Sequence, residues 1–168
     1  MRKSNATIIA GVGMVAFGKP GASDNYDVMG ETAIREALAD SGLDFTQIKQ
    51  AYAGYVYGDS TCGQKVIYKV GMTGIPVFNV NNNCSTGSSA LFMARQAVES
   101  GLVDCALAVG FEQMQPGALG SVWDDRPSPF DDFDAECTDL FDSEAPLALR
   151  YFGGAGKSHM DKYGTELA

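Results

Sequence analysis

The sequence predicts an α/β fold in which short parallel strands alternate with helices. Two observations support this prediction: continuous apolar runs of strand length alternate along the chain with stretches whose apolar residues recur at helical spacing. Of the 168 residues, 45% are hydrophobic and 20% are charged, the balance of an ordinary soluble domain with a sizeable core. Because strands joined by helical crossovers pair in parallel, we expect a sheet covered by helices.

Four apolar runs are expected to form the strands of this sheet. They are compact, and glycines or polar clusters bound them, as is typical of buried strands. In chain order they are Thr7–Val12, Ile48–Tyr57, Ile75–Val80 and Cys105–Phe111.

Helical spacing predicts four helices, and glycines mark where three of them end. Asp27 is expected to cap the start of the first helix. Gly42, Gly71 and Gly101 are expected to end the first three helices in turn. Small residues along the third predict a central helix that its neighbours approach closely. The predicted helices are Tyr26–Ser41, Cys62–Met72, Ser85–Ser100 and Tyr151–Tyr163.

A change of composition predicts two domains, 1–114 and 115–168. Residues 115–150 hold four of the six prolines, and 124–144 hold nine acidic residues opposed by a single arginine. Such acidic density favours a solvated loop region over further sheet.

Charge and cysteine spacing exclude several classes of partner. Twelve basic and 21 acidic residues give a net charge of -9, which disfavours nucleic acid and anionic membranes. The four cysteines are widely spaced and there is one histidine, so we expect no metal site. The first residues lack the pattern of a signal peptide, so reduced thiols in a cytoplasmic compartment are expected.

Cys84 is the candidate nucleophile because it lies where a predicted strand passes into a predicted helix. Helix amino termini present unpaired amides and a positive dipole end, which favour the thiolate, the form of cysteine that attacks acyl groups. The alternative is a buried thiol that acts as a small hydrophobe, the role expected of Cys62, Cys105 and Cys137.

The segment VNNNCSTGSSALFMARQAV at 80–98 resembles the acyl-enzyme signature of the thiolases. GDSTCGQ (58–64), GMTGIP (71–76), LFMARQ (91–96) and AGKSHMDKYGT (155–165) are similar to thiolases of the sterol carrier protein X type. The similarity is good over 1–120, weak over 121–150 and good again from 151. It implies the amino-terminal half of a layered αβαβα fold with a mixed sheet, followed by the start of a loop domain.

The resemblance also implies a reaction and roles for individual residues. Cys84 would carry an acyl group as a thioester during reversible cleavage of a 3-ketoacyl-CoA, and its backbone amide would contribute to an oxyanion hole. Coenzyme A and acyl-CoA would be substrates, with no permanently bound cofactor. Phe152 matches a position that lines the acyl pocket. Asn82 and Asn83 are expected to shape the turn before Cys84, although a hydrogen bond from them to substrate remains open.

Glu112 and His159 match positions for which we favour structural roles. We expect backbone amides to satisfy the Glu112 carboxylate, with a catalytic role as the alternative. His159 falls in the predicted last helix, where a local contact is expected.

In the family, the base and the second acid come from a carboxyl-terminal half that no motif of this chain matches. We therefore expect an exposed apolar face where that half belongs, and an inactive fragment without it. Relatives dimerise through the sheet edge near Ile75–Val80, which implies a homodimer, and those of eukaryotes are peroxisomal. A non-catalytic acyl-CoA-binding or scaffolding subunit and a ketoacyl synthase are the alternatives. The GMTGIP and GDSTCGQ segments favour the thiolase branch over the synthase.

Overall fold

The computed structural model describes residues 6–116, 123–137, 145 and 147–166. The chain divides into two compact units, Met1–Pro116 and Gly117–Ala168. The assignment of 1–114 to a nucleophile-bearing core and of 115–168 to a loop domain stays a prediction.

The first unit is built on a three-stranded sheet in the order β2-β1-β3, with β1 at Gln50–Gly54, β2 at Val77–Val80 and β3 at Ala106–Gly110. Both pairings are parallel, and the register places Gly54 beside Val80 and Gly110, so the three strands end at one edge. The predicted α/β fold is confirmed. Among the described residues, the sheet contains no antiparallel strand of the kind that a mixed sheet requires.

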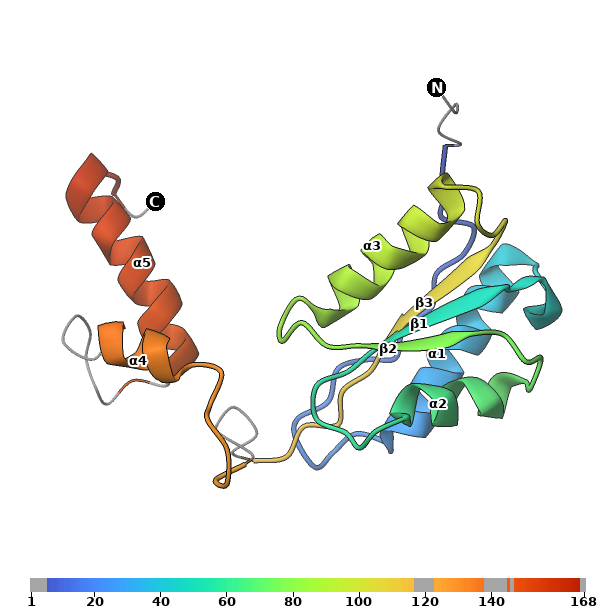
Figure 1. The fold of residues 1–168 in the computed structure, drawn as a ribbon, viewed down its shortest axis with the longest axis horizontal. Coiled ribbons are helices and arrows are strands. Elements are labelled where there is room, and N and C mark those ends of the chain that lie inside the picture. Colours follow the sequence, from blue (N-terminus) through green and yellow to red (C-terminus); the bar gives the residue numbers. More distant parts are fainter. Residues whose placement is uncertain (1–5, 117–122, 138–144, 146, 167–168) are drawn as a thin grey trace. The chain divides into compact units, whose positions relative to one another are not determined.

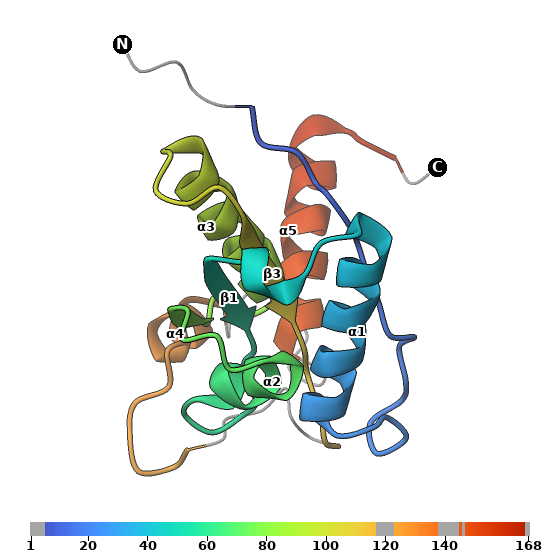
Figure 2. The same cartoon turned by 90° about the vertical axis from the view of Figure 1, so that its right-hand side faces the viewer.

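Helices cover both faces of this sheet. Figures 1 and 2 show α1 (Tyr26–Ser41) and α2 (Cys62–Val70) on one face and α3 (Thr86–Glu99) on the other. Side chains alternate between the faces along β1, so Ala51 and Ala53 belong to the larger core and Tyr52 to the smaller one. The larger core lies under α1 and α2 and includes Ile34, Val66 and Ile67, all almost fully buried.

The small residues of α3 pack against the sheet, as predicted. Ala90, Ala94 and Ala97 are buried, and they bring the helix close to the strands. The outer side of the same helix leaves Leu91 and Phe92 about half exposed, at 49% and 56%. That a further part of a complete protein packs on these two side chains stays a prediction.

The first helix has the predicted bounds, but its amino terminus is capped differently. Asn25, and not Asp27, is the N-cap residue, and its side chain makes no capping hydrogen bond. The Tyr26 amide instead donates to Gln113 Oε1 at 3.0 Å, from the segment after β3. Asp27 lies in the first turn, where it forms an ion pair with Lys69 at 3.1 Å. The helix ends at Gly42, whose φ of 69° is the left-handed conformation expected there.

The predicted strand at Thr7–Val12 is wrong, because this segment pairs with no strand among residues 6–116 or the other described ranges and instead runs beside α1. A Cβ on Gly11 or Gly13 would collide with backbone carbonyls of α1. The amides of Val12 and Met14 donate to carboxylates of that helix at 2.9 and 3.1 Å. The glycines of this run therefore allow contact with a helix. The apolar side chains remain exposed, with Ile8 at 79%.

The second unit contains α4 (Asp131–Cys137) and α5 (Leu147–Tyr163). Helix α4 lies inside the stretch predicted to be a solvated loop, so that prediction is wrong for residues 131–137. Three aspartates occupy its first turn, where the helix dipole favours negative charge. Within the described ranges, no helix is long and apolar enough to cross a membrane.

Candidate active site

Cys84 lies in the turn that joins the end of β2 to the start of α3, as predicted. It is exposed, and Thr86, the first residue of the helix, follows two positions later. Asn83, immediately before it, has a φ of 49°, a left-handed conformation that asparagine tolerates better than most residues. The turn therefore presents the Cys84 thiol outward at the carboxyl edge of the sheet.

Hydrogen bonds within this turn define its shape. Thr86 Oγ1 accepts from the Asn82 amide at 2.8 Å and donates to the Asn83 carbonyl at 2.6 Å. The Asn82 side chain donates to Ser89 Oγ at 2.9 Å, and the Asn83 amide donates to Asn81 Oδ1 at 3.1 Å. These contacts support the turn-shaping role expected of the asparagines.

Two glycines at the strand ends let the first turn of α3 lie directly on the sheet. A Cβ on Gly54 would be 2.8 Å from Thr86 Cγ2 and 3.1 Å from Thr86 O. Gly110, beside Gly54 in register, would place a Cβ 3.8 Å from the Gly87 Cα. The side chain of Thr86 is itself buried, at 6% exposed. The position of Cys84 thus depends on a close contact between Gly54 and Thr86.

The other three cysteines are less accessible than Cys84, and all four are free thiols. Cys105 is half-buried just before β3, and burial raises the pKa of its thiol, with the Lys49 charge acting in the opposite direction. Cys62 and Cys137 are buried. Cys137 closes α4, in the stretch where the sequence predicted a loop. These positions agree with the structural roles expected of all three.

Glu112 follows β3 and holds the loop that follows β1. Its Oε2 accepts the Val56 amide and its Oε1 accepts the Tyr57 amide, both at 2.9 Å. Backbone amides therefore satisfy both oxygens, as expected for a structural carboxylate. Tyr57 also lies in this loop, and no sequence pattern marks it as a candidate site residue. Its pKa is raised by burial, then by the Glu112 carboxylate and by Cys84.

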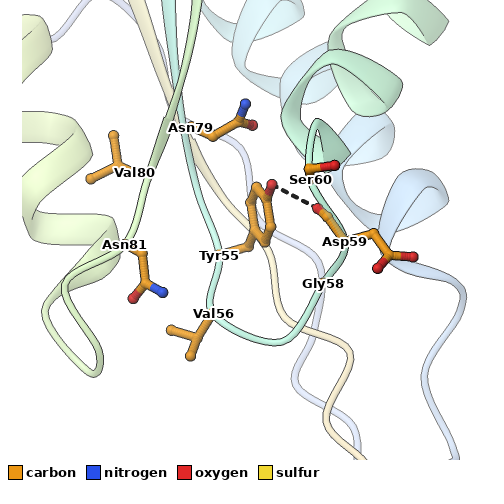
Figure 3. Close-up of a pocket in the computed structure, with 8 residues that line it drawn as sticks. All are labelled: Tyr55, Val56, Gly58, Asp59, Ser60, Asn79, Val80 and Asn81. Carbon is orange, nitrogen blue, oxygen red and sulfur yellow. Dashed lines mark hydrogen bonds between the residues drawn. The ribbon is translucent and has the colours of Figure 1, made fainter. Parts of the chain in front are cut away.

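A shallow cavity of about 210 Å³ opens beside this loop, and Figure 3 shows its lining side chains. One wall is the loop after β1, where Tyr55 OH donates to the Asp59 carbonyl at 2.9 Å. The other wall comes from the end of β2, including Asn79 and Asn81. Cys84 is not among the lining residues, so we do not assign this cavity to an acyl group.

Two further candidates from the sequence lie on α5, in the second unit. Phe152 is 75% exposed, and its contact with an acyl chain stays a prediction. The His159 ring packs on Tyr163 with the ring centroids 4.8 Å apart, a local contact within the helix. The described part of the chain contains no group of three side chains able to hold a metal ion.

A parallel α/β sheet with an exposed cysteine at a strand-to-helix turn agrees with the class of protein that the sequence resembles. The model of the thiolase amino-terminal domain matches residues 7–121. The chain therefore belongs to the thiolase family.

Individual relatives confirm the predicted resemblance to the sterol carrier protein X type. Sterol carrier protein 2 from Oryctolagus cuniculus is 50% identical over 163 residues, covering 95% of this chain and 30% of the relative. Benzoylsuccinyl-CoA thiolase subunit BbsB from Thauera aromatica is 37% identical over 114 residues, 67% of this chain and 29% of that protein. The chain thus spans about 30% of the length of these relatives.

A solved structure shares the fold over most of the chain. The structure of an Ltp2-ChsH2(DUF35) aldolase superposes with a TM-score of 0.64 and 17% identity, covering 94% of this chain and 38% of that one. At this identity the similarity shows the thiolase-like fold alone.

Proposed function

We propose that this chain supplies the acylated nucleophile of a thiolase-type acyltransferase that acts on 3-ketoacyl-CoA in lipid or sterol side-chain metabolism. The observation that carries the proposal is the exposed Cys84 thiol in the turn before α3 of a thiolase amino-terminal domain. Coenzyme A and acyl-CoA are the proposed substrates, and no permanently bound cofactor is required.

In the degradative direction, the Cys84 thiolate attacks the keto carbonyl of a 3-ketoacyl-CoA. The bond between C2 and C3 then breaks, and its electron pair stays on C2. The CoA thioester that contains C1 and C2 therefore leaves as an enolate, which takes up a proton. The thiolate of a free CoA attacks the acyl-Cys84 thioester, which releases the Cys84 thiolate and a shortened acyl-CoA. Both additions develop a negative oxygen, which backbone amides at the start of a helix are suited to stabilise.

Other groups must move the protons in these steps, and we propose that the carboxyl-terminal half of a complete thiolase supplies them. Two side chains of this chain that match family positions are Glu112 and His159. Glu112 accepts hydrogen bonds from two backbone amides, and the His159 ring contacts Tyr163. Within the described part of the first unit, Glu112 therefore makes no contact that would let it act as a base toward Cys84. The nucleophile and the groups that move protons would therefore belong to different parts of the enzyme.

We also propose a homodimer that pairs through the edge at β2. This strand lies at the end of the order β2-β1-β3, so one side of its backbone is free of a partner within the described sheet. A free strand edge is a template for pairing with a second chain. Light scattering that finds the full-length protein to be a monomer at micromolar concentration would contradict this proposal. A cytoplasmic location is likewise proposed.

The covalent step is tested by exposing the full-length protein to acetyl-CoA and mapping the adduct by peptide mass spectrometry. We expect an acetyl group on Cys84 that Cys84→Ala abolishes. Cys105→Ala is the matched control, because burial raises the pKa of that thiol and it should not compete. A folded protein that carries no acetyl group on Cys84 would instead support a non-catalytic binding or scaffolding role.

A further inference from the structure

We infer that Glu112 is a positioning residue that fixes the loop after β1 beside the Cys84 turn and thereby sets the rate at which Cys84 is acylated. This inference rests on the proposed function, since it concerns the acyl-transfer step at the same site. It adds a role for a carboxylate that touches neither the thiol nor the substrate.

The first support is the geometry of the carboxylate itself. Its two oxygens accept the amides of consecutive residues, Val56 and Tyr57, at 2.9 Å each. An ionised carboxylate can accept at both oxygens, whereas a glutamine can accept at one and must donate from the other. The arrangement thus requires a carboxylate, and hydrogen bonds to a charged acceptor are about twice as strong as neutral ones.

The second support is that the same loop is also attached to the strand that leads to Cys84. The Tyr55 amide donates to the Val80 carbonyl at 3.2 Å, at the end of β2. On its other side, the Phe111 amide donates to the Gly54 carbonyl at 3.1 Å. Three consecutive amides, from Tyr55 to Tyr57, are therefore held by β2 on one side and by Glu112 on the other. The loop spans the carboxyl edge of the sheet, where α/β proteins place their ligands.

The third support is that the charges of both Glu112 and Cys84 act on the Tyr57 side chain. Tyr57 is half-buried, and both Glu112 and Cys84 are close enough for their charges to raise its pKa after the larger effect of burial. A shift of the loop would therefore move a tyrosine ring relative to the thiol. Since acyl transfer requires alignment of reacting groups, a small displacement lowers the rate of acylation without removing the nucleophile.

Glu112→Gln and Glu112→Ala test this role in the full-length protein. The maximal rate of Cys84 acetylation should fall about tenfold in Glu112→Gln, equivalent to about 1.4 kcal/mol in activation free energy, and further in Glu112→Ala. The acetyl-CoA concentration at half-maximal rate should be unchanged. Rates are compared well below the melting temperature of each variant, so that loss of folded protein does not contribute.

The matched control is Glu99→Gln, which removes a carboxylate of the same kind from the last turn of α3. Glu99 pairs with Arg95 at 2.7 Å on the surface and contacts no part of the Cys84 turn in the described structure. Its acetylation rate should equal that of the unmodified protein. Alkylation of Cys84 by iodoacetamide, a small reagent that needs no aligned acyl group, should be equal in all four proteins.

The possible results separate the inference from the proposed function. Equal acetylation rates in the Glu112 variants and the parent protein would overturn the inference while leaving the proposed function intact. A parallel fall in acetylation and alkylation would also overturn it, because it would indicate general damage to the thiol. No acetylation of the parent protein would reject the proposed function, and with it the role of Glu112 in acylation.

Discussion

Gly54→Ala tests whether the contact between β1 and the first turn of α3 positions Cys84. The added Cβ would lie 2.8 Å from Thr86 Cγ2 and 3.1 Å from Thr86 O. Thr86 cannot rotate its methyl group away easily, because its hydroxyl is held by Asn82 and Asn83 at 2.8 and 2.6 Å. The start of α3 must therefore move. Overpacking of this kind costs about 1–3 kcal/mol, and the lower entropy of unfolded alanine offsets about 0.4–1 kcal/mol of it.

Urea unfolding followed by circular dichroism should show a net loss centred on about 1.3 kcal/mol for Gly54→Ala, the difference between the midpoints of these two ranges. Gly110→Ala is the matched control, since it lies beside Gly54 on the same face and its Cβ meets nothing closer than 3.8 Å. Adding Thr86→Ser, which removes Cγ2 and keeps the hydroxyl, should restore the part of the loss that the 2.8 Å contact with Cγ2 causes. If Gly54→Ala is as stable as the parent, or Thr86→Ser gives no rescue, the contact does not position the turn.

Three further outcomes follow from the first unit. Ile34, on the buried face of α1, is only 1% exposed, so Ile34→Ala should cost about 2–5 kcal/mol in urea unfolding, and a loss below about 1 kcal/mol would contradict the packing described. The hydrogen bond from Lys69 holds the pKa of Asp27 below its ordinary value of 3.8, so this ion pair stabilises the fold above that pH and is lost as the pH falls through the lowered pKa. Asp27→Asn should therefore weaken the acid dependence of the melting temperature below about pH 4, and an unchanged dependence would exclude the pair as its source. A hydrogen bond with Cys62, followed by burial and nearby charges, raises the pKa of Tyr26 to about 12, and Cys62→Ala should lower it toward 10.0 in an ultraviolet titration. A value that stays near 12 would assign the shift to burial and to the charges of Asp27 and Asp59.

Elements that depend only on residues close to one another in the sequence could be predicted from it. The bounds of α1 coincide with the predicted Tyr26–Ser41, because helical periodicity and a left-handed Gly42 are both local signals. Helix α3 differs by one residue at each end, at Thr86 and Glu99. The location of Cys84 followed from the same signals, since a strand and a helix of known bounds leave one turn between them. The sequence does not predict α4, because a high density of acidic residues indicates a solvated loop, although acidic residues in a first turn also favour a helix.

The strand predicted at the start of the chain shows why composition can mislead. An apolar run that contains glycines is typical of a buried strand, but the same residues suit a segment pressed against a helix. Here, Gly11 and Gly13 are needed for backbone contact with α1, and carboxylates of that helix take the amides that a neighbouring strand would accept. Which of the two structures forms depends on the element that packs against the segment. A single sequence does not identify that element.

The contacts that hold the candidate site together are long-range for the same reason. Gln113 caps α1 across 87 positions of sequence, and Glu112 reaches Val56 across 56. The two adjacent side chains point to different neighbours, so one fastens a helix and the other fastens the loop beside Cys84. A glutamate followed by a glutamine forms no sequence pattern that predicts a contact. Both side chains are equally common on a solvent-exposed surface. Only the parallel register, which brings the ends of β1 and β3 together at Gly54 and Gly110, makes these two residues neighbours of the elements they hold.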